Sequence, residues 1–243
     1  MTALLTTSWD DGHILDLRLA DLLSRYGFKA TFYVAREYAT PRLTESQMRD
    51  LATRHEIGAH TLTHPQLTQI APEQARAEIT GSRQWLEDVL GQPVTTFCYP
   101  RGDTNAQVKA LAQAAGFRLA RTVQAYSIAR PADPMAVATT FQVYPFPRRP
   151  IRARNPLRPY QPLWAALPHA VRLRLGPGTL SQWTRVALAT LERAIETDGV
   201  WHLWGHSWEI EQYDLWHALE ECLKMAQHYP GRRVVNSQLL PEQ

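Results

Sequence analysis

The sequence is poor in lysine and in cysteine. Lysine occurs three times in 243 residues, so arginine supplies nearly all of the 26 basic side chains. The two cysteines, Cys98 and Cys222, are too few for a disulfide framework. The chain also lacks an apolar run near the roughly 18 residues of a membrane span, and its first residues lack the leader of a signal peptide. We therefore expect a soluble protein of a reducing compartment, the cytoplasm.

Acidic residues are missing from one long stretch. Residues 140–178 contain no aspartate or glutamate and hold eight of the 17 prolines, a content that disfavours regular helix or central strand. The same stretch holds seven arginines: Arg148, Arg149, Arg152, Arg154, Arg158, Arg172 and Arg174. Because the whole chain has a net charge of only +3, the residues outside this stretch have a net charge of −4.

This polarity leads us to expect a Pro/Arg-rich insertion at about residues 144–178. In one interpretation it is a solvated loop packed on the domain by Phe146, Tyr160 and Trp164. In the other it is a lid that faces an anion, or a contact with a membrane surface.

Hydrophobic spacing outside this stretch alternates between the strand period and the helix period. Strands are predicted at residues 3–9, 29–34, 55–59, 94–98, 117–122 and 200–205, and a further one near 136–143. Helices are predicted at residues 14–26, 44–54, 72–90, 105–115, 180–196 and 213–228. This alternation indicates an α/β protein with a parallel sheet covered by helices. In open sheets and closed barrels alike, ligands bind where the strands end.

The first predicted strand is followed by two adjacent carboxylates, Asp10 and Asp11, and by Gly12. Adjacent like charges repel unless they share a cation or a proton. One of the two could cap the following helix, but hardly both.

Histidines follow two other predicted strands. His60 and His64 come after the third strand, four residues apart, a spacing that arises by chance often enough to be weak evidence alone. Together with an aspartate they would form a three-ligand metal site with open positions, the catalytic kind. Strand alternation places His206 at the end of the last strand and His202 one layer deeper, where a core role is expected.

These motifs, in this order, resemble those of the polysaccharide deacetylase family, the NodB-homology or family 4 carbohydrate esterases. Asp10-Asp11-Gly12 is similar to the family's T-F-D-D-G motif, His60-Thr61-Leu62-Thr63-His64 to its H-[S/T]-x-x-H motif, Phe97 to Gly102 to its third motif, and Leu203 to His206 to its Leu-x-His motif.

The resemblance implies one domain over residues 1–243 with a distorted (β/α)7 TIM-like barrel. It also implies a divalent metal on Asp11, His60 and His64, usually Zn2+, with Co2+, Ni2+ or Mn2+ as alternatives. Asp10 would be the general base for the attacking water, and His206 the general acid for the leaving amine, with His202 as the alternative acid.

Further residues are assigned on the substrate side. A backbone N–H near Tyr99 to Arg101 would hold the oxyanion, and Trp204, Leu203 and Trp208 are candidates for the acetyl pocket. The third motif has Cys98 where the family has an arginine, and our hypothesis is that Arg101 replaces it. The acidic residue that tunes the acid histidine is Glu209, Asp133 or Asp214. We also expect Arg148, Arg149, Arg152 and Arg154 to hold an anionic part of the substrate, such as a phosphate.

The expected activity is removal of an N-acetyl or similar small acyl group from an amino sugar of a glycan or glycan precursor. A cytoplasmic site would suit a lipid-linked or nucleotide-linked precursor, with no nucleic-acid partner. One alternative is a hydrolase of a non-sugar C–N bond, as in imidases and allantoinases. The other is a catalytically silent carbohydrate-binding relative.

Overall fold

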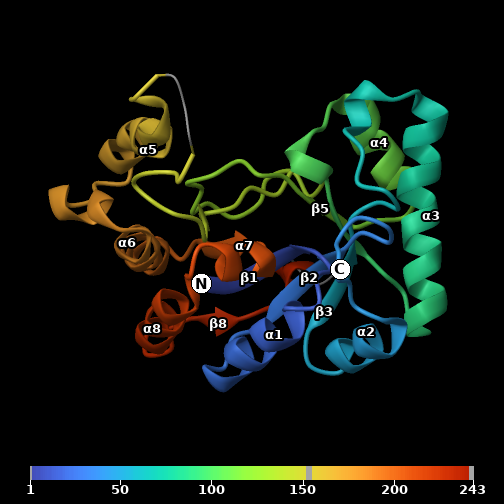
Figure 1. Cartoon of the computed structure of the whole chain (residues 1–243), viewed down its shortest axis with the longest axis horizontal. Helices are drawn as coiled ribbons and strands as arrows, with labels where there is room; N and C mark the ends of the chain where they lie inside the picture. Colours follow the sequence, from blue (N-terminus) through green and yellow to red (C-terminus); the bar gives the residue numbers. More distant parts are fainter. Residues whose placement is uncertain (1, 152–154, 241–243) are drawn as a thin grey trace.

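The structure, a computed structural model, describes residues 2–151 and 155–240, and over these residues its centre is a curled parallel sheet (Figure 1). The strands are β1 (Leu4–Asp11), β2 (Ala30–Val34), β3 (Glu56–Ala59), β4 (Thr96–Cys98), β5 (Leu119–Arg121), β6 (Phe141–Gln142), β7 (Val200–Gly205) and β8 (Arg232–Arg233). Their order is β5-β4-β3-β2-β1-β7-β6, and β8 pairs with the first residues of β1.

The two ends of this sheet meet through the segment from Val137 to Gln142. At its beginning, Val137 bridges Arg121 of β5, and at its end Gln142 pairs with Trp204 of β7. This one segment therefore pairs with β5 at one side of the sheet and with β7 at the other. The strands therefore surround a common interior, and the distorted (β/α)7 barrel expected from the resemblance is confirmed.

Helices follow the strands and cover the outside of the sheet (Figure 1). They are α1 (Asp16–Arg25), α2 (Glu45–Ala52), α3 (Pro72–Leu90), α4 (Ala106–Ala114), α5 (Gln161–Arg172), α6 (Trp183–Glu196), α7 (Ser207–Gln212) and α8 (Trp216–Ala226). Helix α2, predicted at residues 44–54, begins at a capping box in which the Thr44 side chain accepts a hydrogen bond from the Gln47 N–H. Within the described residues, none of the helices combines the length and apolarity needed to cross a bilayer.

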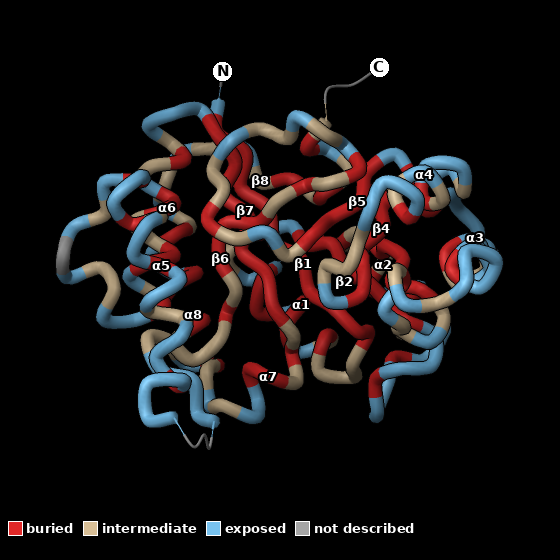
Figure 2. The backbone as a smooth tube through the Cα atoms, turned by 90° about the horizontal axis from the view of Figure 1, so that it is seen from above, coloured by how far each residue is buried: buried red, intermediate tan, exposed pale blue. Residues whose placement is uncertain are grey.

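The interior of the barrel is polar at the end opposite the site. Asn236 accepts a hydrogen bond from Thr6 Oγ1 at 2.8 Å and donates one to the Tyr33 hydroxyl at 2.9 Å. Closer to the site, Ser8 Oγ and His202 Nε2 lie 2.8 Å apart. All of these side chains are buried, and the central strands are buried along their length (Figure 2). The described end of the chain therefore closes the base of the barrel with hydrogen bonds.

The Pro/Arg-rich stretch is more regular than its composition predicts, because it contains α5. Pro162 lies in the first turn, where no intrahelical acceptor is needed, and Pro168 costs the helix one hydrogen bond. The expectation that Tyr160 and Trp164 pack this stretch onto the domain is wrong, because their side chains are 37% and 54% exposed. Phe146 does pack against the core.

Candidate active site

The side chains at the carboxyl ends of five strands lie close together. Asp10 and Asp11 end β1, His60 follows β3, Cys98 ends β4, Arg121 ends β5 and His206 follows β7. Each comes from a different strand except the aspartate pair. The barrel thus gathers residues that are up to 196 positions apart at one end.

The carboxylate of Asp11 faces two imidazoles. Its Oδ1 lies 3.8 Å from Nε2 of His60 and 3.8 Å from Nε2 of His64, and it is buried without a hydrogen-bond donor. Its Oδ2 accepts a hydrogen bond from Trp208 Nε1 at 2.8 Å. Trp208 therefore fixes one oxygen and leaves the other turned toward the histidines.

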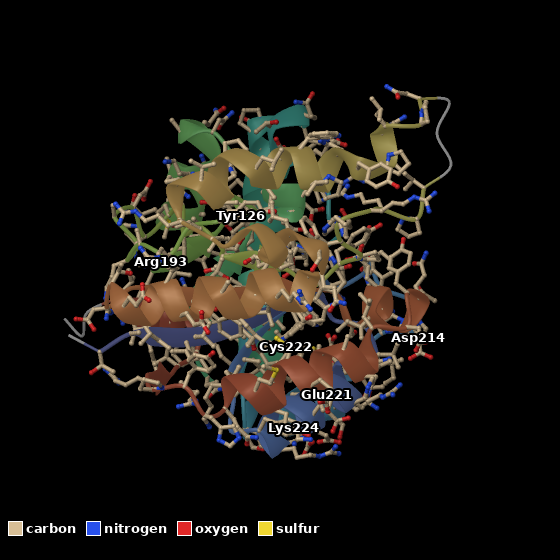
Figure 3. The ribbon with its side chains drawn as sticks, turned by 90° about the vertical axis from the view of Figure 1, so that its left-hand side faces the viewer. Tyr126, Arg193, Asp214, Glu221, Cys222 and Lys224 are labelled. Carbon is tan, nitrogen blue, oxygen red and sulfur yellow. The ribbon has the colours of Figure 1, made fainter. Side chains whose placement is uncertain are left out.

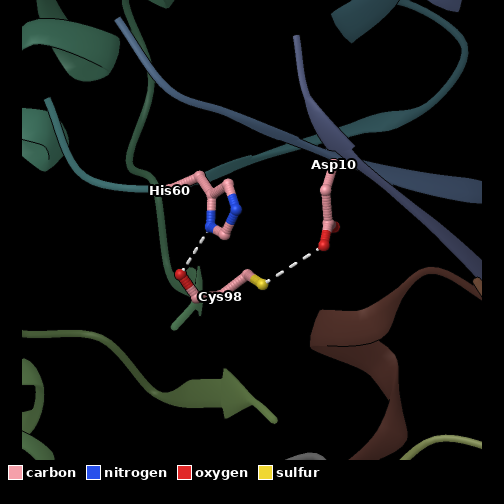
Figure 4. A group of neighbouring side chains, drawn as sticks. All are labelled: Asp10, His60 and Cys98. Atoms are coloured by element: carbon pink, nitrogen blue, oxygen red, sulfur yellow. Dashed lines mark hydrogen bonds between the residues drawn. The ribbon is translucent and has the colours of Figure 1, made fainter. Parts of the chain in front are cut away.

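The histidines are held as neutral ligands. The carbonyl oxygen of Cys98 lies 2.7 Å from His60 Nδ1 and accepts a hydrogen bond from its N–H, which leaves the Nε2 lone pair toward Asp11 (Figure 4). The ring of Tyr38 stacks on His64 with 4.0 Å between ring centroids. Burial lowers the pKa of both His60 and His64 to about 4. Both imidazoles are therefore uncharged at neutral pH.

Helix α3 shapes the loop that carries these histidines. The carboxylate of Glu78 accepts hydrogen bonds from the backbone N–H groups of Leu62 and Thr63 at 2.8 and 2.9 Å. His64 has a φ of 60°, in the left-handed region that residues with a side chain rarely adopt. Glu78 thus supports an unfavourable backbone turn that brings the second histidine back toward the first.

Asp10 is paired with Arg121, and this corrects our hypothesis that Arg101 takes the place of the family's arginine. The Arg121 guanidinium donates to Asp10 Oδ1, and both side chains are buried. Cys98 Sγ donates to the other oxygen at 3.7 Å (Figure 4). Burial raises the pKa of Asp10, but the charge and hydrogen bond of Arg121, together with the neighbouring His60 and His206, outweigh burial and hold the pKa below its ordinary value.

His206 is oriented by Glu209. Its Nδ1 lies 2.5 Å from Glu209 Oε2, and its Nε2 lies 4.0 Å from Asp11 Oδ2. Burial lowers the pKa of His206, but the hydrogen bond to Glu209 and the charges of Asp11 and Asp10 raise it to about 9. His202 is buried deeper on Ser8, with a pKa lowered by burial to about 3. Of the two histidines, His206 is the one that carries a proton at the mouth of the barrel.

A cavity of about 620 Å³ adjoins these residues. Trp204 and Glu209, which both contact His206, line this cavity, and so do Arg101 and Arg149. Its remaining walls include four aromatic residues, Tyr126, Phe141, Tyr144 and Phe146, among smaller apolar side chains. A partly apolar cavity with a few charged groups is the usual form of a small-ligand site.

Four of the expected substrate-side residues are not among those that line this cavity. One is Trp208, whose Nε1 donates to Asp11 Oδ2. Tyr99 is fully buried and donates its hydroxyl proton to the Met135 carbonyl oxygen at 3.0 Å. Leu203 belongs to the hydrophobic core. Arg148 is exposed and is not among the lining residues. Arg152 and Arg154 lie outside the described residues.

Residues that no motif marks complete the arrangement. The alternation of side chains along a strand could have indicated Arg121, because it lies near the end of a predicted strand and on the same face as the buried Leu119. Asp16 looks like a helix-capping residue, but it is buried and accepts a hydrogen bond from Ser207 Oγ at 2.6 Å, which ties α1 to the residue after His206. Glu78 gives no sequence signal, because only the fold brings α3 to the loop.

The group Asp11, His60 and His64 fits a divalent cation. One atom from each side chain lies within 4.8 Å of the others. Asp11 Oδ1 is an orphaned buried acceptor that faces two neutral imidazoles, an arrangement that costs free energy unless a cation satisfies it. One carboxylate and two imidazoles are also a donor set that zinc and similar metals accept.

Part of the sequence is similar to known polysaccharide deacetylases. The family model described as polysaccharide deacetylase matches residues 3–120. Chitin deacetylase 1 of Cryptococcus neoformans is 32% identical over 112 residues, which are 45% of this chain and 23% of that protein. The peptidoglycan-N-acetylglucosamine deacetylase PgdA of Listeria monocytogenes is 31% identical over 105 residues, 42% of this chain and 22% of that protein. This chain thus covers less than half the length of the curated relatives it matches.

A solved structure agrees over nearly the whole chain. It is that of a Mycobacterium smegmatis protein assigned to the polysaccharide deacetylases, with a TM-score of 0.63 at 16% identity over 93% of this chain and 85% of that one. This likeness concerns the fold. The sequence match includes both the Asp10-Asp11 turn and the His60–His64 loop, so residues 3–120 are similar to polysaccharide deacetylases, and the chain as a whole shares the fold of this solved structure.

Proposed function

We propose that this protein is a metal-dependent amide hydrolase that removes an N-acetyl or similarly small acyl group from an amino sugar. The observation that carries the proposal is that two adjacent carboxylates have different partners. Asp10 is paired with Arg121, whereas Asp11 faces two neutral imidazoles. The named activities of the relatives, on chitin and on peptidoglycan N-acetylglucosamine, support an acetylated amino sugar as the substrate class.

Asp10 and His206 both neighbour Asp11 of the cation site: Asp10 precedes it in the chain, and His206 Nε2 lies 4.0 Å from its Oδ2. Asp10 is an ionised carboxylate at neutral pH and can accept a proton from an attacking water. His206 is protonated and can donate to the leaving amine, which must gain a proton before it departs. A divalent cation on Asp11, His60 and His64 would supply Lewis acidity, polarising the acyl carbonyl and lowering the pKa of a nearby water.

The turn after β4 offers a donor for the developing oxyanion. The Tyr99 N–H is already committed, because it donates to the Arg121 carbonyl oxygen at 3.2 Å. The next N–H belongs to Arg101, because proline at position 100 has none, and it has no acceptor within the described part of the chain. Arg101 has a φ of 57°, a turn conformation that can aim this N–H away from the strand.

The cationic groups at the cavity suggest a substrate with an anionic part, such as a phosphate. Arg101 and Arg149 both line the cavity. Guanidinium groups bind phosphate and carboxylate oxygens in a bidentate manner. We therefore propose an acylated sugar carried on a charged or phosphorylated group.

Replacement of Asp10 by asparagine tests the proposal. The Asp10→Asn variant should keep its metal, measured by elemental analysis, and lose release of acetate from acetylated amino-sugar oligosaccharides by at least about a hundredfold. The exposed carboxylate of Asp21 on α1 gives the matched control, Asp21→Asn, which should retain full activity.

Three results would contradict the proposal. Full activity in Asp10→Asn would remove this residue as the base. Turnover of cyclic imides without turnover of acetylated sugars would assign a non-sugar C–N hydrolase. A wild-type protein that binds sugar but takes up no metal would be a silent binding relative.

A further inference from the structure

The outer face of α5 is apolar and exposed to solvent. Trp164, Leu167 and Val171 are 54%, 41% and 80% exposed. They are three and four positions apart, so they form one stripe along the helix. Six of the eight exposed large hydrophobic side chains in the described part of the chain lie between residues 151 and 171. Exposed apolar side chains concentrated in this way mark a contact surface, whereas scattered ones do not.

This stripe is not a core face of a helix that has failed to dock. The opposite face of α5 is already packed, with Ala166 and Ala170 buried. The ring of His169 stacks on Tyr126 at 4.7 Å between centroids, and Arg172 donates to the Tyr126 carbonyl oxygen at 2.7 Å. Figure 3 shows α5 above α6, with Tyr126 below α5. The helix is therefore fixed on the barrel with its second apolar face turned outward.

Positive charge surrounds the stripe. Arg158 lies just before α5, Arg174 lies just after it, and Arg148 and Arg149 belong to the preceding loop; all four are exposed. Residues 140–178 contain no acidic residue that could neutralise them. A second copy of the chain on this face would bring two sets of arginines together, at a cost in repulsion. A surface that is both apolar and anionic is complementary to the stripe and its arginines.

We propose that α5 binds the surface of an anionic phospholipid bilayer. Trp164, Leu167 and Val171 would enter the boundary between headgroups and acyl chains, while the arginines contact lipid phosphates. An apolar helix face with tryptophan and flanking arginines is the composition of an interfacial helix. Each arginine near an anionic surface strengthens binding about fivefold.

The same helix forms part of the wall of the cavity at the barrel mouth, through Pro162 and Ala165. In Figure 3 the beginning of α5 lies at the same end of the molecule as Asp214, which follows α7 and the site strand β7. Binding through α5 would thus hold the cavity close to the lipid surface. The binding itself does not depend on the proposed reaction, so the two can fail separately.

Sedimentation with vesicles tests the proposal. The wild-type protein should bind vesicles of equimolar phosphatidylcholine and phosphatidylglycerol at low ionic strength, and bind phosphatidylcholine vesicles far less. The double variant Leu167→Glu/Val171→Glu should bind the anionic vesicles at least about tenfold more weakly than the wild type. The control is Met225→Glu, at an apolar residue of α8 that is 53% exposed, and it should bind like the wild type.

A second pair of variants isolates the charge. Arg158→Glu/Arg174→Glu should weaken vesicle binding by more than tenfold and reduce its salt dependence. Arg76→Glu, at an exposed position of α3, should change neither. Circular dichroism and thermal unfolding of each variant show that the fold is kept.

Three results would overturn the proposal. The first is a wild-type protein that does not sediment with anionic vesicles, and the second is binding that the α5 variants leave unchanged. The third is a wild-type dimer in solution that Leu167→Glu/Val171→Glu converts to a monomer, without vesicle binding, which would assign the stripe to self-association. Acetate release from a soluble oligosaccharide, measured on the same preparations, reports the proposed reaction separately.

Discussion

Asp10 and Asp11 are neighbours in sequence but lie in different electrostatic surroundings. Asp10 receives hydrogen bonds from Arg121 and Cys98, whereas one oxygen of Asp11 has no donor and burial raises its pKa. Two adjacent carboxylates thus become a stabilised anion and an unsatisfied ligand. Two carboxylates so close can both be ionised because each has a counterion: the Arg121 guanidinium for Asp10, and a bound divalent cation for Asp11.

The first prediction at this scale concerns Arg121. In Arg121→Gln, burial of Asp10 is no longer opposed by the guanidinium, so its pKa rises and the acidic limb of the pH–rate profile moves to higher pH. Loss of one partner of a buried pair should also lower the free energy of unfolding by about 3 kcal/mol or more. Activity against pH and thermal unfolding measure the two effects.

Arg101→Ala and Arg149→Ala are the matched comparison. They should raise KM for an anionic substrate, because both side chains line the cavity, and leave the acidic limb in place. An acidic limb that moves in Arg101→Ala and stays in Arg121→Gln would restore the assignment of Arg101 as the partner of the base.

A second residue-scale prediction concerns Glu209. The carboxylate of Glu209 helps to raise the pKa of His206 to about 9, so His206 keeps its proton through neutral pH. In Glu209→Gln the pKa of His206 falls, and the alkaline limb of the rate profile should move to lower pH while the acidic limb stays. Asp214→Asn, at another acid considered for this role, should move neither limb. An unshifted alkaline limb in Glu209→Gln would show that Glu209 does not set the protonation of His206.

At the scale of elements, the turn between β1 and α1 decides whether Asp11 can face the histidines. Asp11 has a φ of 84° and Gly12 one of 73°, so the chain reverses within two residues. A Cβ at Gly12 would lie 2.5 Å from Val34 Cγ1 on the neighbouring strand β2. The turn can therefore pack against β2 only with glycine at this position.

The prediction here compares two glycines. Gly27, after α1, has a φ of 72°, and a Cβ there would meet no atom within 4 Å. Both Gly12→Ala and Gly27→Ala pay the cost of the left-handed conformation, about 1–2 kcal/mol. Gly12→Ala adds a clash and should lower the free energy of unfolding by about 1–3 kcal/mol more. It should also weaken zinc binding, which calorimetry measures, while Gly27→Ala should not. Equal losses of stability in the two variants would mean that the turn relaxes freely.

Features set by residues close together in the sequence could be predicted, and features set by contacts between distant elements could not. Periodicity predicted α3 to the residue, and the rule of strand ends brought Asp10, Asp11, His60, His64 and His206 to one place. Helix α5 was missed because its prolines were counted without regard to position, although Pro162 is harmless in a first turn. Arg121 and Glu78 were missed for another reason. Their partners lie on other elements, and only the assembled fold makes them neighbours.

At the scale of the whole molecule, the cation site joins parts of the barrel that lie far apart in the chain. Its three side chains come from the ends of β1 and of β3, and Trp208 from α7 bonds one of them. A ligand that binds only the folded state stabilises all of these elements together. Zinc at about a hundred times its dissociation constant should add about 2.7 kcal/mol to the free energy of unfolding.

We therefore predict that zinc raises Tm by about 5–10 °C and that a chelator reverses the change. The rise should be small or absent in His64→Gln. It should be complete in His217→Gln, at an exposed histidine of α8. Differential scanning calorimetry measures the shifts. The same rise in His64→Gln and in the wild type would place the bound zinc elsewhere.

The closing segment of the barrel has a consequence for the half of the chain that carries the family match. Residues 3–120 supply β1 to β5, but the partners that cover the far side of β1 and of β5 come later, from β7, β8 and the segment beginning at Val137. Made alone, this half would present two unpaired sheet edges, the long one at β1 and a short one at β5, and an open interior of polar side chains. Such edges recruit strands from other molecules. The most recognisable half of the sequence should therefore aggregate when it is expressed by itself, and its solubility depends on residues that the family model does not match.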